Sequence, residues 1–111
     1  MKFDDHLEGN VVILTVSGKI MGGEETTMFH GKIHEYINMN KLSFVVDLEK
    51  VEWMNSVGLG MLISALTTVK NSKGRLVMAN ITTIESILTI TRLISVFEHY
   101  DSCEEAVKSF S

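Results

Sequence analysis

The chain has 111 residues, of which 45% are apolar and 22% charged, so it is long enough to build one domain with a real core without disulfides or structural metal ions. Its 14 acidic and 10 basic residues give a formal net charge of -4, and no run of Lys or Arg could follow a phosphate backbone, which argues against nucleic acid as a partner. The amino terminus lacks the apolar stretch of a signal peptide, and the apolar window at 57–66 is too short to span a bilayer. The one cysteine, Cys103, permits no internal disulfide. We therefore expect a cytoplasmic protein without membrane insertion.

Apolar, β-rich runs predict the strands. Residues 11–16 form a nearly continuous run that Ser17 and Gly18 close, residues 44–48 form a second run, and residues 76–79 form a third. Runs of this kind suit strands that are buried on both faces. Residues 3–7, before the Glu8-Gly9-Asn10 turn, predict a short edge strand, and residues 96–100 predict a short final one.

Between these runs the apolar period changes from two to about 3.6, which predicts helices. The first covers residues 24–38, with acidic residues in its first turn and with Met28, Ile33, Tyr36 and Ile37 roughly on one face. The second covers residues 57–71, and its apolar stripe consists of Leu59, Leu62, Ile63, Leu66 and Val69.

Capping boxes of the form S/T-x-x-E predict two further helix starts, one from Thr82 to Glu85 and one from Ser102 to Glu105. The chain has no proline, no low-complexity segment and no internal repeat, so residues 1–111 are expected to form one domain. The order ββαβαβαβα predicts an α/β fold: a mixed sheet of four to five strands with right-handed crossovers and about four covering helices.

One serine, Ser56, stands between the second buried strand and a helix start that carries Gly58 and Gly60. Serine is a preferred N-cap residue, because its oxygen accepts a hydrogen bond from an otherwise unpaired amide of the first turn. The two glycines leave little side chain over that turn. We therefore expect an exposed hydroxyl, whose simplest role is to cap the helix.

Two chemical roles fit the surroundings of Ser56 poorly. The nucleophile elbow G-x-S-x-G has Met54 at its first glycine position, and His99 is the only histidine after the serine, so a hydrolase using Ser56 with His99 is the last of the hypotheses. A phosphate cradle G-x-G-x-x-G starting at Gly58 has Ile63 at its last glycine position, and G-x-x-x-x-G-K-[ST] is absent. These motifs predict no catalytic residue and no cofactor.

In a further role, Ser56 is the substrate of a kinase. A phosphoserine adds a charge of about -1.5 to -2 and three acceptor oxygens, and at a helix N-terminus this charge meets free amides and the positive end of the dipole. A partner docked over the glycines would have to desolvate the dianion, which costs several kcal/mol. Because about 2.8 kcal/mol is already a hundredfold in affinity, one phosphate could turn binding off.

The segment Val45-Val46-Asp47-Leu48, followed after four residues by Trp53-Met54-Asn55-Ser56-Val57-Gly58-Leu59-Gly60-Met61-Leu62, resembles the signature of STAS domains, specifically of bacterial anti-sigma factor antagonists. The similarity extends over nearly the whole chain, including the strand exit at 16–20 and the segment 73–80. It implies one STAS domain over 1–111 without enzymatic activity. It also implies that an anti-sigma factor that is a serine kinase phosphorylates Ser56.

The resemblance further implies partner switching. The unphosphorylated protein binds the anti-sigma factor and frees sigma, phosphorylation releases the complex, and a metal-dependent serine phosphatase resets the protein. The partner-binding residues that the resemblance implies are Met21, Asn55, Val57, Gly58, Leu59, Gly60 and Met61.

The usual family pattern is Asp-Ser-(Ser/Thr)-Gly-Leu-Gly, and this chain departs from it. Asn55 replaces the Asp, keeping its shape and capping ability but losing its charge. Val57 replaces the Ser or Thr, so Ser56 is the only hydroxyl of the motif. Met21 stands where the family often has an acidic residue, so a contact to the kinase would differ.

Several other residues have two possible roles. His30 and His34 are four apart on a helix, but no third ligand is near, so a solvated helix face is favoured over a metal site. Asp47 either lies where α/β folds bind ligands or caps the following turn. Trp53 and Met54 either pack beneath the loop or supply one exposed docking anchor. Met61, away from the main apolar stripe, is the better candidate for a partner contact.

A second function stays open beside the phosphorylation switch. The chain could be a STAS-like scaffold or a subunit of another complex, for example in lipid transport. In that role Ser56 would only cap its helix.

Overall fold

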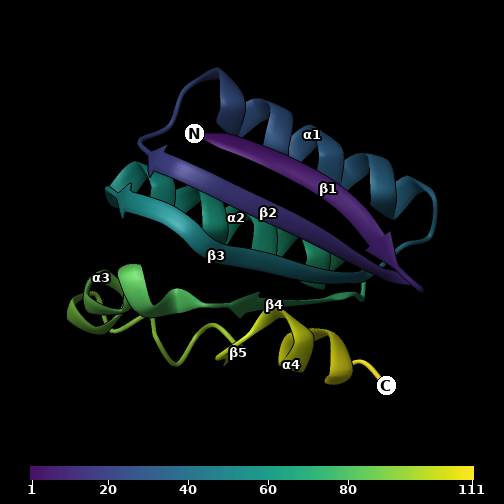
Figure 1. The fold of residues 1–111 in the computed structure, drawn as a ribbon. Helices are drawn as coiled ribbons and strands as arrows, with labels where there is room; N and C mark the ends of the chain where they lie inside the picture. Colours follow the sequence, from purple (N-terminus) through teal and green to yellow (C-terminus); the bar gives the residue numbers. More distant parts are fainter.

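The computed structural model describes residues 1–111 and contains a five-stranded sheet in the order β1-β2-β3-β4-β5 (Figure 1). The strands are β1 (Lys2–Glu8), β2 (Val11–Ile20), β3 (Ser43–Met54), β4 (Arg75–Ala79) and β5 (His99–Tyr100). β1 runs antiparallel to β2, and the other neighbouring strands pair in parallel. The predicted α/β fold with a mixed sheet and the predicted order of elements are confirmed.

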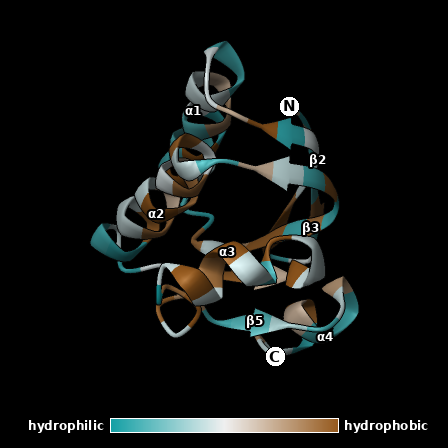
Figure 2. Cartoon of the chain, turned by 90° about the vertical axis from the view of Figure 1, so that its left-hand side faces the viewer, coloured by the Kyte–Doolittle hydropathy of each residue, from teal (hydrophilic) through white to brown (hydrophobic).

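Four α-helices cover the sheet: α1 (Glu24–Asn38), α2 (Ser56–Asn71), α3 (Glu85–Ile90) and α4 (Cys103–Lys108), with a 3-10 turn, η1 (Ile81–Thr83), before α3. α1 and α2 lie side by side against one face, and α4 lies against the other (Figures 1 and 2). No helix of the chain combines the length and the apolar character that a membrane span requires.

The side chains of β2 alternate between two apolar clusters, as expected for a strand buried on both faces. Val12, Leu14 and Val16 belong to the larger cluster of 24 buried residues, which α1 and α2 cover. Val11 and Ile13 belong to the cluster of 6 that contains residues of α4. The prediction that this strand is buried on both faces is confirmed.

β2 and β3 extend well beyond the apolar runs that predicted them. β2 passes through Gly18, whose φ of 84° suits a glycine, and two register shifts let it stay paired with β3 as far as Ile20 and Met54. β5 is shorter than predicted, with only two residues. The extension of β3 matters for function because it carries the chain to the start of α2.

Two details of the predicted helices are wrong. Met28 is 62% exposed. The buried stripe of α1 consists of Phe29, Ile33 and Tyr36, and Met28, one residue before Phe29, lies outside it. The capping box at Thr82 does not form, since Thr82 lies inside η1 and no side chain caps α3.

The second predicted cap is present. Ser102 Oγ accepts a hydrogen bond from the Glu105 amide at 3.1 Å and begins α4.

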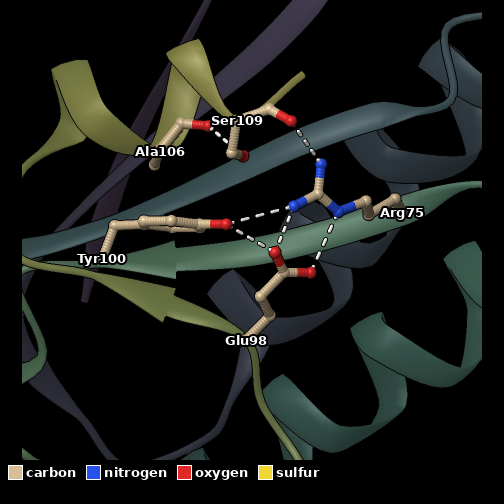
Figure 3. Close-up of polar contacts among 5 residues, drawn as sticks. All are labelled: Arg75, Glu98, Tyr100, Ala106 and Ser109. Atoms are coloured by element: carbon tan, nitrogen blue, oxygen red, sulfur yellow. Dashed lines mark hydrogen bonds and ion pairs between the residues drawn. The ribbon is translucent and has the colours of Figure 1, made fainter. Parts of the chain in front are cut away.

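Arg75 ties the C-terminal segment to the sheet (Figure 3). Its Nε donates to Glu98 Oε1 at 2.9 Å, and its Nη1 donates to the Ser109 carbonyl at 3.0 Å. Tyr100 donates to Glu98 Oε2 at 2.7 Å, and the guanidinium lies 4.5 Å from the centre of the Phe110 ring. The hydrogen bond from Arg75, followed by that from Tyr100, lowers the pKa of Glu98.

Candidate functional site

Ser56 is the first residue of α2, and its neighbour Asn55 is the N-cap. Asn55 has an extended backbone (φ -102°, ψ -176°), and its Oδ1 accepts a hydrogen bond from the Gly58 amide at 2.9 Å. The expectation that Ser56 caps the helix is therefore wrong by one position. The consequence is chemical: the exposed Ser56 hydroxyl is not needed to hold the helix start together.

The start of α2 is fixed against the end of β2. The Asn55 amide donates to the Ile20 carbonyl at 3.2 Å, directly after the last β2–β3 pair. A Cβ built on Gly58 would lie 2.5 Å from the same carbonyl oxygen, whereas one built on Gly60 would meet nothing within 4 Å. Gly58 is thus a buried packing residue that lets the helix approach the sheet, while Gly60 is an open position on the surface.

Exposed apolar side chains adjoin Ser56. Val57 is 57%, Met21 53% and Trp53 50% exposed. Val57 also contacts the loop that carries Met21, since a Cβ built on Gly22 would lie 2.6 Å from Val57 Cγ1. Large apolar side chains left in water next to one hydroxyl are typical of a surface that binds another protein.

The structure buries three of the residues expected to meet a partner: Gly58, Leu59 and Met61. Leu59 is 4% and Met61 3% exposed, so the expectation of an exposed Met61 is wrong. Met61 lies on the flank of α2 that faces α1, where it lines a groove together with His30. Because α2 packs against both the sheet and α1, its buried face is wider than the apolar stripe in the sequence indicates.

Of the two residues before the site, Met54 packs beneath the loop, with 5% of it exposed, and Trp53 is the exposed one. Asp47 has a structural role inside β3. Its Oδ1 accepts hydrogen bonds from Asn80 Nδ2 at 2.9 Å and from the Glu49 amide at 3.1 Å. These bonds hold the left-handed residue that follows β4 and the backbone of β3 itself.

His99 is not brought to Ser56. It pairs with Met78 of β4, which in turn pairs with Val46 of β3. From Val46, β3 continues for eight residues to Met54, about 26 Å of extended chain at about 3.3 Å per residue. The hypothesis of a hydrolase with this serine–histidine pair is wrong.

His30 and His34 have ring centres 6.2 Å apart, and no third His, Cys, Asp or Glu completes a group with them that could hold a metal ion. His30 lies partly buried against α2. Burial, and secondly the neighbouring His34, lower the pKa of His30.

Sequence reasoning missed two features of this region. It assigned the cap to Ser56 and not to Asn55, although asparagine is as good an N-cap as serine. It also missed a groove of about 220 Å³ in which Trp53 and Met54 meet Ile87 and Ile90 of α3. Figure 2 shows brown, apolar ribbon in α3. Of its apolar residues, Ile90 is 81% exposed.

By its fold, the chain is an α/β domain in which a mixed five-stranded sheet presents a serine at the start of its second helix. A family model described as STAS domain matches residues 3–106. The chain therefore belongs to the STAS domain family, as the sequence motif predicted. Among curated proteins, no match is found.

Solved structures share this fold. A putative anti-sigma factor antagonist from Thermotoga maritima has a TM-score of 0.83 at 23% identity, over 96% of this chain and 92% of that chain. The Bacillus cell fate determinant SpoIIAA in its phosphorylated form has a TM-score of 0.76 at 17% identity, over 99% and 100%. A sulfate transporter family protein from Wolinella succinogenes has a TM-score of 0.71 at 11% identity, over 94% and 87%. At these identities the likeness shows the fold alone.

Proposed function

We propose that this chain is an anti-sigma factor antagonist whose binding to an anti-sigma factor, itself a serine kinase, is controlled by reversible phosphorylation of Ser56. One observation carries the proposal: Ser56 is exposed on the first turn of α2, and the cap that a serine there would ordinarily provide is supplied by Asn55. A kinase can therefore modify the hydroxyl without unmaking the helix start.

The local electrostatics favour a phosphate at this position. α2 is 16 residues long and has no acidic residue in its first turn, so the positive end of its dipole is not yet compensated. A phosphate there is favourable by about 0.3–1 kcal/mol at an exposed site. Asn55 adds no negative charge beside it, whereas an Asp at that position would repel the phosphate.

A phosphate on Ser56 would disturb the binding of a partner to the surrounding surface. A partner that covers the exposed side chains of Val57 and of the adjacent loop residue Met21 removes apolar area from water and covers Ser56, the neighbour of Val57, as well. Once Ser56 carries a dianion, the same docking would bury an uncompensated charge, at a cost of several kcal/mol. Phosphorylation then releases the partner, and a metal-dependent serine phosphatase restores the binding form.

The test is phosphorylation by a candidate anti-sigma factor kinase from the same genome, with Mg-ATP. We expect the intact chain to gain the mass of one phosphoryl group, mapped to Ser56 by peptide analysis, and the Ser56→Ala variant to gain none. Calorimetry should then show that the kinase binds wild type and Ser56→Ala alike but binds the phosphorylated chain at least about a hundredfold more weakly. Addition of phosphate elsewhere, or equal binding of both forms, would refute the proposal.

A second candidate is a STAS scaffold or subunit in a complex without a kinase. The sulfate transporter family protein, which shares the fold, favours it, because this fold also occurs in proteins whose names do not involve sigma factors. In this case the surface of Met21, Trp53 and Val57 still binds a partner, but Ser56 stays unmodified. Intact mass of the chain purified from its own cells, with and without phosphatase treatment, distinguishes the two candidates.

A further inference from the structure

β1 is an edge strand of the sheet, since it pairs with β2 on one side and with no strand on the other (Figure 1). A two-residue turn joins it to β2, so Glu8 and Val11 form a hydrogen-bonded pair. Hydrogen-bonded pairs alternate along an antiparallel ladder, and the amides and carbonyls of Phe3, Asp5 and Leu7 therefore point away from β2. No turn, loop or helix supplies a backbone partner for them. Such an open edge is a template on which another strand can pair.

The side chains of β1 divide between its two faces. On the face toward α1, the Phe3 ring packs against the edge of Phe29, with 5.4 Å between the ring centres. The Tyr36 hydroxyl donates to Asp5, and Leu7, on the same face, is 44% exposed. The opposite face carries only polar residues, all of them exposed: Lys2, Asp4, His6 and Glu8.

The charged face of β1 is complementary to a second copy of itself. Two copies that pair in antiparallel fashion about a two-fold axis at Asp5 place Lys2 of each copy opposite Glu8 of the other. The same pairing places Asp4 opposite His6. Opposite charges that face each other across two strands stabilise the pair, and neither Lys2 nor Asp4 has an ion-pair partner within its own chain.

The face toward α1 favours the same register. Phe3 of each copy lies opposite Leu7 of the other, so the pairing covers an apolar side chain that is otherwise exposed. A two-fold axis one residue earlier would instead set Asp4 against itself and Phe3 against Asp5. An axis one residue later would set Asp4 against Glu8. Of these registers, only the one centred on Asp5 matches charges on one face and apolar side chains on the other.

We propose that the open edge of β1 binds a second copy of this chain, in a two-fold dimer whose β1 strands pair antiparallel and join the two sheets into one. The inference goes beyond the proposed function, since it uses none of the exposed residues around Ser56. A single pair of strands buries less area than a permanent dimer needs, so the association is reversible and depends on concentration. At the axis Asp5 faces its own copy, with each carboxyl group hydrogen-bonded by Tyr36, and this like-charged pair weakens the dimer.

Hydrogen exchange of the full chain, followed by NMR from micromolar to millimolar concentration, tests the proposal. We expect the amides of Phe3, Asp5 and Leu7 to exchange more slowly as the concentration rises, while the sedimentation coefficient moves from that of a monomer to that of a dimer. The amides of Asp4 and His6, which already bond to β2, are internal controls and should change little. A monomer at every concentration, or a dimer that leaves the edge amides unprotected, would overturn the proposal.

Charge reversal separates strand pairing from a general effect of charge. Lys2→Glu and Glu8→Lys should each weaken the dimer about tenfold, because the affected pair occurs twice in it, and the double variant should restore the association. Lys108→Glu, an equal change of charge at an exposed position of α4, is the matched control and should leave the dimer unchanged. Asp5→Asn keeps an oxygen for the Tyr36 hydrogen bond and removes the repulsion at the axis, so it should tighten the dimer at least about threefold. Equal effects of Lys2→Glu and Lys108→Glu, or a double variant as weak as the single ones, would also overturn the proposal.

Discussion

Replacing Asn55 with alanine is expected to lower the free energy of unfolding by about 1–2 kcal/mol. Loss of an N-cap side chain costs about 0.5–2 kcal/mol in general. The upper half of this range applies here, because the amide that loses its acceptor belongs to the buried Gly58 and cannot turn to water. For a domain of this size, each kcal/mol corresponds to a fall in Tm of about 4–8 °C.

Two matched variants isolate the cap. Asn55→Asp keeps an acceptor oxygen and adds a charge at the positive end of α2, so it should equal or exceed the wild type by about 0.3–1 kcal/mol. Ser56→Ala removes a hydroxyl that caps nothing and should stay within about 0.5 kcal/mol of the wild type. Urea unfolding followed by circular dichroism measures all three variants, with an unchanged m-value showing that only stability has moved.

The reasoning is refuted if Ser56→Ala is as destabilising as Asn55→Ala. That result would mean that the serine hydroxyl holds the first turn in solution. Its phosphorylation would then have to break the helix start, contrary to the argument that the fold tolerates the phosphate.

Three further outcomes follow from contacts elsewhere in the fold. Gly58→Ala places a Cβ against the Ile20 carbonyl and should destabilise the protein by about 1–3 kcal/mol in urea titrations. The control Gly60→Ala should be neutral or slightly stabilising, and equal effects of the two variants would contradict the close approach of α2 to the sheet. The hydrogen bond to Asp5 raises the pKa of Tyr36 to about 12. The contribution of this bond to stability, about 1 kcal/mol, is therefore present below pH 10 and is lost between pH 10 and 12. Tyr36→Phe should be less stable than the wild type at neutral pH, and the stabilities of the two proteins should converge over that window. The Arg75 partner lowers the pKa of Glu98, so the contribution of this ion pair to stability is present above pH 4.5 and is lost as the pH falls below it. Glu98→Gln should lower the free energy of unfolding by about 0.2–1 kcal/mol at pH 7, and its stability should converge with that of the wild type in acid. A stability difference that stays constant down to about pH 2 would count against the ion pair.

The sequence predicted the elements of this fold but not where the two central strands end. The apolar runs at 11–16 and 44–48 mark the parts of β2 and β3 that are covered by helices on both faces. Beyond them the strands carry polar residues such as Lys19 and Glu52, whose own pattern does not indicate a strand. Pairing between the two strands holds these segments extended, and pairing is a tertiary effect that a local pattern does not contain.

The candidate site was located correctly but assigned the wrong capping residue. Asn55 and Ser56 are both good N-cap residues, so local preference could not choose between them. The hydrogen bond from the Asn55 amide to Ile20 decides the matter, because it keeps Asn55 in the extended strand geometry that a cap requires. The burial of Met61 was missed for a similar reason, since it depends on the packing of α1 beside α2.

Some residues of the motif have structural roles that do not bear on function. Gly58 is required by the approach of α2 to the Ile20 carbonyl, and an acceptor side chain at position 55 is required to cap the helix. In this chain both are explained by the packing and capping of α2, whichever partner it binds. The positions free to encode the partner are those that the fold leaves exposed, above all Ser56 and Val57. The hydroxyl of Ser56 and its exposed neighbours therefore bear on which partner this chain binds, whereas the glycine that packs beneath them does not.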